Sequence, residues 1–75
     1  MKFLQLTSKD FNKEYLRLIQ DIFQIHGEKY GDWYTLDSTI FVNAVLSNVQ
    51  VKQDIDFGFK ITEWLQSYPA LLYKI

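Results

Sequence analysis

Val49-Gln-Val-Lys-Gln-Asp-Ile-Asp-Phe-Gly-Phe-Lys-Ile61 contains two competing periodicities, and the predicted fold class depends on which of them the chain adopts. Every odd position except Gln53 is apolar, and every even position is polar or glycine. This alternation is typical of a half-buried strand, and Val, Ile and Phe favour strands. Gly58 disfavours a helix, and a turn near residues 52–54 would divide the run into a hairpin. The alternation therefore predicts two antiparallel strands that end at about Ile61.

A helical pattern overlaps the end of this stretch. Five apolar residues recur there at the spacing of one helix face: Phe57, Ile61, Trp64, Leu65 and Tyr68. A third helix over residues 56–68 would turn the chain into a compact bundle of three or four helices. We favour the strands, and predict a small α+β domain in which a long N-terminal helix packs on a short antiparallel hairpin, with one or two further short helices. The all-α bundle is the alternative.

The N-terminal helix is predicted from about Ser8 to His26. Thr7 or Ser8 caps its free amides, and Gly27 stands where many helices end in the left-handed conformation. Apolar residues cover about half of the circumference, which predicts a central helix packed on two sides. These residues are Phe11, Tyr15, Leu16, Leu18, Ile19, Ile22, Phe23 and Ile25.

The middle of the chain is assigned from turn and cap signals. Residues 28–37 are predicted to form a loop, because turn-prone residues stand near both of its ends. A second helix is predicted over about Ser38–Asn48, with Asp37 or Ser38 as its cap. Its β-branched residues weaken this assignment, but the cap gives it a defined beginning.

The two ends of the chain complete the predicted fold. A short helix runs from a Thr62 cap to Tyr68, where Pro69 ends it. Residues 70–75 form an apolar tail, and residues 1–6 can add a strand beside the hairpin. Residues 1–75 are expected to be one domain, because domains much smaller than this are rare.

The composition combines many aromatic residues with no cysteine. The 75 residues include six Phe, five Tyr and two Trp. A chain of this size buries only about 60% of its unfolded surface, and neither disulfides nor a Cys/His zinc site can supplement its core. Rings and aliphatic side chains must therefore hold the fold together. We expect no cofactor and no metal.

Charge and hydropathy disfavour further classes of protein. Eight basic and nine acidic side chains give a net charge of −1, so the chain offers no strongly basic field to nucleic acid or to an anionic membrane. Runs of consecutive apolar residues such as Ile40-Phe41-Val42 are far too short to span a bilayer. Residues 1–7 lack the apolar stretch of a signal peptide. We therefore expect a cytoplasmic protein with no membrane partner.

Motifs for catalysis or metal binding are not found. His26 is the only histidine, and the carboxylates near it lack the spacing of a zinc site. Asp54-Ile-Asp-Phe-Gly58 has the first two acids of a calcium loop, but its glycine comes one residue early and Leu65 stands where a bidentate Glu is required. The serines occur in no G-x-S-x-G setting. We therefore predict that the chain is not an enzyme.

Three aromatic residues in the predicted loop are the candidate binding residues. Tyr30, Trp33 and Tyr34 lie in a polar, turn-rich segment, and Tyr and Trp are common in binding hot spots. The alternative is that these rings fold back over the core. If they are exposed, we expect a small non-enzymatic module, such as an inhibitor, an antitoxin-like factor or an accessory subunit, that occludes a partner protein. Acids would orient the partner: Asp32, Asp37, Asp54 and Asp56.

The alternative function is a dimeric regulator associated with nucleic acid. Lys9, Lys13 and Arg17 have i, i+4, i+8 spacing and would form a basic ridge on the predicted first helix. Acidic residues interleave with them, which favours an ordinary solvated face and makes nucleic acid the weaker hypothesis. A homodimer is also possible on this sequence, with Tyr73 and Ile75 of the apolar tail packed across its interface.

Overall fold

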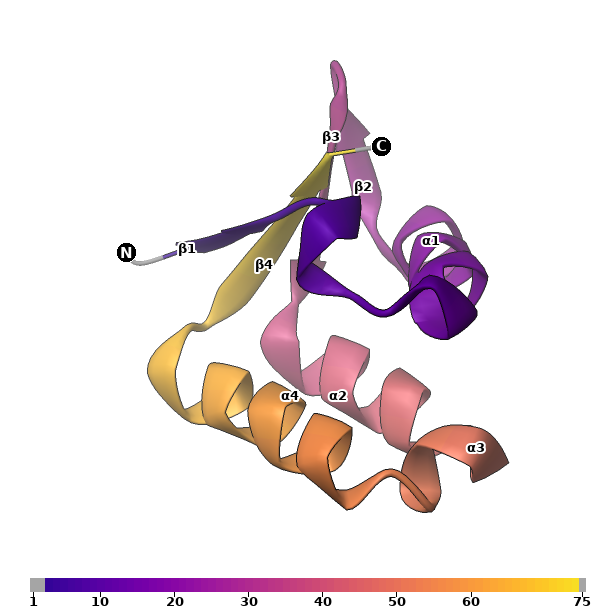
Figure 1. The fold of residues 1–75 in the computed structure, drawn as a ribbon. Coiled ribbons are helices and arrows are strands. Elements are labelled where there is room, and N and C mark those ends of the chain that lie inside the picture. Colours follow the sequence, from indigo (N-terminus) through magenta and orange to yellow (C-terminus); the bar gives the residue numbers. More distant parts are fainter. Residues whose placement is uncertain (1–2, 75) are drawn as a thin grey trace.

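The computed structural model describes residues 3–74 and has an α+β fold built on one mixed sheet of four strands (Figure 1). The strand order is β1-β4-β3-β2, so the C-terminal strand lies inside the sheet. β1 pairs with β4 in parallel, and the other two pairings are antiparallel. The strands are β1 (Phe3–Leu6), β2 (Glu28–Tyr30), β3 (Trp33–Asp37) and β4 (Ala70–Lys74).

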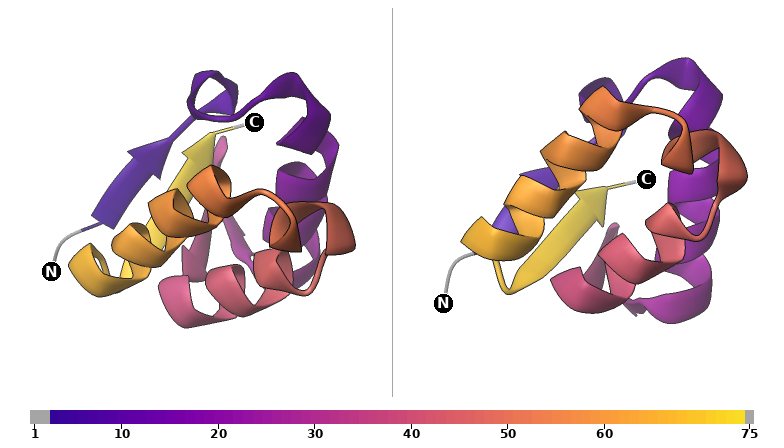
Figure 2. Two further views of the ribbon diagram at one scale, coloured as in Figure 1. Left: turned by 60° about the horizontal axis from the view of Figure 1, so that its bottom comes forward. Right: turned by 90° about the horizontal axis from the view of Figure 1, so that it is seen from below.

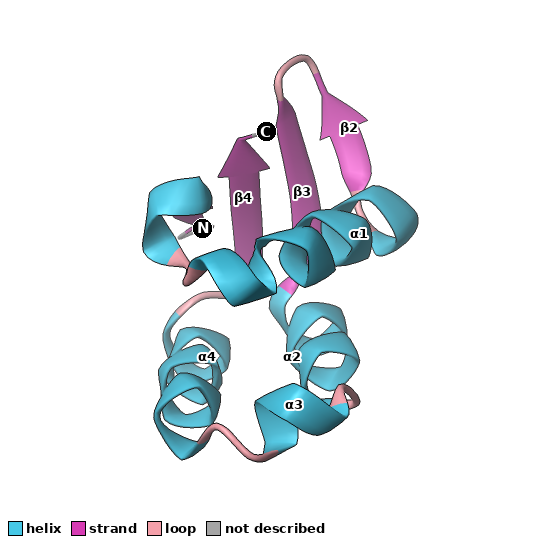
Figure 3. Cartoon of the chain, turned by 45° about the vertical axis from the view of Figure 1, so that its right-hand side comes forward, coloured by secondary structure: helices cyan, strands magenta, loops and turns pink. Residues whose placement is uncertain are grey.

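One face of the sheet is covered by helices and the other face is open (Figure 3). Leu6 and Tyr73 are neighbours on the covered face, as are Leu71 and Leu36, and all four are buried. The residues between them are exposed or half-buried, as expected from the alternation of side chains along a strand. This open face therefore carries every second residue of each strand.

The helices lie on the covered face and beyond one end of the sheet. α1 packs on β3 and β2, whereas α2 and α4 pack against each other below the sheet (Figure 2). Two 3₁₀ turns, η1 (Ser8–Asp10) and η2 (Lys13–Tyr15), connect β1 to α1. The α-helices are α1 (Leu16–His26), α2 (Ser38–Leu46), α3 (Val49–Lys52) and α4 (Ile55–Ser67).

The predicted strands over residues 49–61 are wrong, because this stretch forms α3 and the first half of α4. The Asn48 side chain caps α3 by accepting from the Gln50 and Val51 amides, and Asp54 caps α4 by accepting from the Phe57 amide. The alternation did not mark a buried face. Val51, Phe57 and Ile61 are buried, whereas Val49, Ile55 and Phe59 are exposed. The competing helical pattern was the correct one.

The strands of the sheet come from segments predicted to be loop and tail. Residues 28–37 form a β-hairpin, in which Gly31 and Asp32 make the turn between the paired Tyr30 and Trp33. Gly31 has φ of 61°, as expected for the first turn position of a two-residue hairpin of type II′. The predicted α+β class is therefore confirmed and the all-α bundle is wrong, although the predicted hairpin was placed in the wrong segment.

Both chain ends contribute to the sheet. The strand predicted within residues 1–6 is confirmed as β1 for the residues described, but it pairs in parallel with β4 and not with a hairpin at residues 49–61. The predicted apolar tail is β4, and Tyr73 is fully buried, so Tyr73 does not pack across a dimer interface. Ile75 lies outside the described residues.

The first helix begins later than predicted. Thr7 and Asp10 form a reciprocal capping box around η1, and Phe11 then returns to an extended conformation. The α-helix begins only at Leu16. Gly27 is also extended and not left-handed, with φ of −92° and ψ of 176°. The helix ends at His26 as predicted, and the second helix and its Asp37 cap are confirmed with an end at Leu46.

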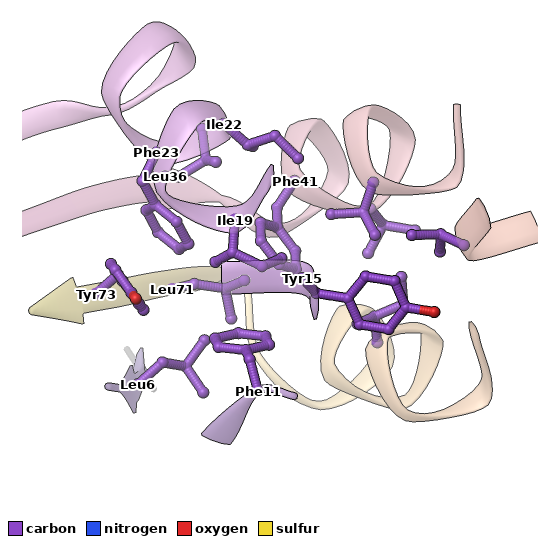
Figure 4. Packing of buried hydrophobic residues seen from close by; sticks show 14 of the residues in the cluster. Leu6, Phe11, Tyr15, Ile19, Ile22, Phe23, Leu36, Phe41, Leu71 and Tyr73 are labelled. Carbon is purple, nitrogen blue, oxygen red and sulfur yellow. The ribbon is translucent and has the colours of Figure 1, made fainter. Parts of the chain in front are cut away.

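Aromatic rings fill the space between sheet and helices (Figure 4). The Tyr73 ring is stacked on Phe23 with the centroids 5.0 Å apart, and it lies 6.0 Å from Phe11. Phe23 in turn meets Phe41 of α2 at 5.4 Å. The cluster joins β4, α1 and α2, and it meets the requirement that rings hold this cysteine-free chain together.

Substitutions of two glycines by alanine are predicted to have opposite effects. A Cβ at Gly27 would lie 2.5 Å from the Phe23 carbonyl oxygen and 2.7 Å from that of Thr35, both backbone atoms. We expect Gly27→Ala to lower the free energy of unfolding by more than about 1 kcal/mol. Gly58 lies within α4 with no atom within 4 Å of the added Cβ, so Gly58→Ala should raise it by about 0.5–1 kcal/mol. Urea unfolding measures both, and equal effects would contradict the packing at Gly27.

The Tyr73 hydroxyl gives a second stability prediction. Among residues 3–74 it is the buried side-chain polar group that has no hydrogen-bond partner. Tyr73→Phe removes this group without opening a cavity, and we expect the free energy of unfolding to stay the same or rise by up to about 1 kcal/mol. Tyr15→Phe is the control, because the Tyr15 hydroxyl donates to Asp54 and its removal should destabilise the fold. A clear loss of stability in Tyr73→Phe would show that the hydroxyl has a partner.

Candidate protein-binding surface

The hairpin places the three predicted aromatic residues on two different faces of the sheet. Tyr30 and Trp33 are paired on the open face, where Tyr30 is 63% exposed. Trp33 is half-buried, and the Lys74 ammonium lies 5.9 Å from its ring centroid. Tyr34 is paired with the buried Tyr73 and packs against the core. Only Tyr30 therefore projects freely, and the alternative that loop rings cover the core applies to Tyr34.

Two of the four predicted acids cap helices. The Asp37 carboxylate accepts from the Thr39 amide at 2.8 Å, and the Asp54 carboxylate accepts from the Phe57 amide at 3.1 Å. Asp32 is exposed in the hairpin turn and Asp56 is exposed in the first turn of α4. The hairpin tip and the start of α4 lie at opposite ends of the molecule (Figures 1 and 3). The seven predicted residues therefore do not form one surface.

The basic ridge does not exist as predicted. Lys9 lies in η1, Lys13 in η2 and Arg17 in the first turn of α1. Residues 11 and 12, between the two 3₁₀ turns, are extended, so these cations do not share one helix face. The geometric basis for the nucleic-acid hypothesis is therefore wrong.

The structure gathers apolar residues on the outward side of α4 instead. Ile55 and Phe59, one helical turn apart, are 71% and 69% exposed. Gly58 and Thr62 lie beside them, and the four residues line a hollow of 280 Å³. Their i, i+3, i+4, i+7 spacing is that of the hole that receives one side chain when two helices pack. We call these four residues, together with Asp54 and Asp56, the α4 surface.

Acidic side chains gather at the N-terminal end of the α4 surface. Asp54 and Asp56 lie between two further hollows, of 580 Å³ and 350 Å³, and line both. Glu14 contributes to the larger hollow and Asp10 to the smaller. The one cation that lines either hollow is Lys60, whose ammonium donates to the Asp10 carbonyl oxygen at 2.7 Å. The exposed apolar residues are thus next to a region of negative charge.

A hydrogen bond fixes the beginning of α4. The Tyr15 hydroxyl donates to the Asp54 carboxylate at 2.7 Å, and the Tyr15 ring stacks on Phe57 with the centroids 4.6 Å apart. This bond raises the pKa of Tyr15 to about 12, with smaller contributions from burial and the nearby carboxylates. The same bond, assisted by the Phe57 amide, lowers the pKa of Asp54 against the opposing effect of burial. The first turn of α4 is therefore held rigidly against η2.

Metal and membrane sites are not found in the described part of the chain. Within residues 3–74 no three His, Asp or Glu side chains are arranged to hold a metal ion. The longest helix there, α4, has 13 residues, and none of the helices has the length and apolarity needed to cross a bilayer. His26 is exposed in the last turn of α1, where a cation would suit the helix dipole.

Comparison with known proteins identifies no relative: no family model, no curated protein and no solved structure matches the chain. Function must therefore be inferred from the surface itself. Sequence reasoning missed Ile55 and Phe59 because it assigned them to the buried face of a strand. The competing helix over residues 56–68 already placed Phe59 on the side away from Phe57 and Ile61, and the observed α4 begins one residue earlier and adds Ile55 to that side.

The pairing of Tyr15 with Asp54 predicts how stability depends on pH. The lowered pKa of Asp54 means that the unfolded chain binds this proton first as the pH falls, so stability is complete above about pH 4 and is lost below it. The raised pKa of Tyr15 means that stability is complete below about pH 10 and is lost toward pH 12. We expect Tyr15→Phe to reduce the loss of stability at both acid and alkaline pH, as measured by urea unfolding at a series of pH values.

Tyr30→Phe is the control for the alkaline limb. The Tyr30 hydroxyl donates to Glu28 on the exposed hairpin, and this bond also raises its pKa. Because Tyr30 is well exposed, solvent screens its interaction, and Tyr30→Phe should leave most of the alkaline loss in place. A Tyr15→Phe variant with the pH dependence of the unsubstituted protein would contradict the role of the Tyr15–Asp54 bond.

Proposed function

We propose that this chain is a non-enzymatic protein-binding module that acts by occluding its partner through the α4 surface. The partner segment would be an amphipathic helix with a large apolar side chain and basic neighbours. The observation that carries the proposal is the pair Ile55 and Phe59, each about 70% exposed beside the carboxylates of Asp54 and Asp56. An inhibitor, an antitoxin-like factor or an accessory subunit could act by such occlusion.

The first support is the cost of leaving these side chains in water. Burying a Phe or Ile side chain contributes about 1.5–3 kcal/mol, and this chain is short of buried apolar surface. Ile55 and Phe59 nevertheless point outward from a helix whose opposite side, with Phe57 and Ile61, is fully used in the core. Adjacent exposed apolar side chains with a polar border are typical of interaction sites.

The second support is shape. Gly58 leaves a gap between Ile55 and Phe59, with open space where its Cβ would be. The Thr62 hydroxyl donates to the Gly58 carbonyl oxygen at 2.7 Å, so it needs no partner from outside. An apolar side chain from another helix can enter this gap without leaving a polar group unpaired.

The third support is charge and rigidity together. Asp54 and Asp56, with Glu14 and Asp10 nearby, favour an approaching segment that carries Lys or Arg. The Asp54 cap and its bond to Tyr15 hold the first turn of α4 before any partner arrives. A surface that is already ordered loses less conformational entropy on binding.

The α4 surface suits this role better than the hairpin does. Of the predicted hairpin anchors only Tyr30 projects freely, because Trp33 lies beneath Lys74 and Tyr34 packs on the core. Binding hot spots are clusters of side chains and not single rings. The hairpin therefore serves as the internal comparison in the experiment below.

The test compares Phe59→Ser with Tyr30→Ser, since these rings are similarly exposed at 69% and 63%. Both variants should keep the melting temperature of the unsubstituted protein. A Lys/Leu amphipathic helical peptide should perturb the backbone amide NMR signals of residues 54–62, and its affinity should fall by about tenfold or more in Phe59→Ser alone. A Glu/Leu peptide of the same pattern should not bind. Perturbation centred on residues 30–34, or equal loss in both variants, would refute the α4 surface.

A second readout uses the native partner. Affinity capture from the source cells is run in parallel with the unsubstituted protein, Phe59→Ser, Tyr30→Ser and Asp56→Lys. We expect one protein to be captured by the unsubstituted chain and by Tyr30→Ser. The same protein should be lost with Phe59→Ser and with Asp56→Lys. A partner lost only from Tyr30→Ser would restore the hairpin hypothesis and reject this proposal.

A further inference from the structure

We propose that β1 is a pairing edge through which two copies of this chain join their sheets. β1 is the first strand of the order β1-β4-β3-β2, so one of its edges has no strand beside it within residues 3–74. Figure 1 and the left view of Figure 2 show no other element along that edge. The N–H and C=O groups along a free edge are a template for another strand.

The two edges of this sheet differ in their protection. β2, at the opposite edge, has three residues and carries the charged Glu28 and Lys29. Short length and charge are the means by which proteins block edge pairing. β1 has the sequence Phe3-Leu-Gln-Leu6, with no charge and no proline. Both edge strands are short, but only β1 lacks the charged side chains that would keep a second strand away.

A second copy is the occupant that fits this edge. A strand edge is complementary to itself in the antiparallel direction, so a twofold axis perpendicular to the sheet satisfies both copies with one patch. Such pairing places no charge of β1 opposite a like charge, and the net charge of −1 opposes association only weakly. The result is one continuous sheet of eight strands, four from each copy.

The faces of the sheet restrict the register, and we propose the one centred on Gln5, an open-face residue within β1. Leu4 and Leu6 lie on the covered face, because they pair with Leu71 and Tyr73, and Gln5 lies on the open face. Residues opposite each other in an antiparallel pair share a face. One residue of β1 must therefore lie directly opposite the same residue of the second copy, with the twofold axis midway between them. With Gln5 opposite its own copy, Leu4 of each chain faces Leu6 of the other, which extends the covered leucine row.

This inference does not rest on the α4 surface. It uses four residues of β1, none of which contributes to the hollows along α4. The contact is small, so we expect a weak dimer, with a dissociation constant of about 1 μM or higher. Failure of one proposal therefore leaves the other intact.

Sedimentation velocity tests the dimer directly. The unsubstituted protein should shift from monomer to dimer between about 1 μM and 1 mM. Gln5→Lys places two ammonium groups opposite each other and should weaken association by about tenfold or more. Gln24→Lys is the matched control, because Gln24 is exposed on α1 and carries the same change of charge away from the edge. A protein that stays monomeric at the highest concentration would overturn the proposal.

Disulfide trapping tests the register. Gln5→Cys puts two thiols across the twofold axis, where antiparallel Cα separations of about 4.5–5.5 Å lie within the range of a disulfide. Mild oxidation should cross-link Gln5→Cys to a covalent dimer at least tenfold faster than Gln24→Cys. Equal rates in the two variants would reject pairing at Gln5, and dimerisation that survives Gln5→Lys would assign the interface to another surface.

Discussion

The packing of the Tyr73 ring against Phe11 and Phe23 joins the two layers of this fold. Tyr73 belongs to β4, which is bonded to β1 on one side and β3 on the other, so its ring fixes the middle of the sheet to the helical layer. A short chain without cysteine has no covalent means of holding segments that are distant in sequence. The ring cluster performs this task, and α2 and α4 pack outward from it.

The outward side of α4 follows from that arrangement. Because Phe57 and Ile61 meet the core, Ile55 and Phe59 must face solvent on the opposite side of the same helix. The Tyr15–Asp54 hydrogen bond then connects this helix to η2, and the carboxylates that border the surface come from both segments. The apolar residues and the charge of the α4 surface are thus held in one place by the same contacts that stabilise the fold.

Much of the local structure could be predicted from the sequence. The Asp37 cap of α2 and the helix end at His26 follow from short-range chemistry, whereas the α+β class was predicted from strands placed in the wrong segment. The assignment of residues 49–61 failed because the exposed apolar residues Val49, Ile55 and Phe59 complete an alternation that imitates the period of a strand. The same error concealed the candidate site, since Ile55 and Phe59 were counted among the residues to be buried. The hairpin was missed because its strands are too short for alternation to be distinguished from a loop.

Residue types and their near neighbours were enough to predict that rings form the core, that Asp37 caps α2 and that Gly31 permits a tight turn. Which apolar residues are buried could not be predicted in the same way. Tyr73 in the apparent tail is buried and Phe59 in the apparent strand is exposed. Burial depends on segments far apart in the chain, such as β1 and β4, and their meeting is a property of the whole fold.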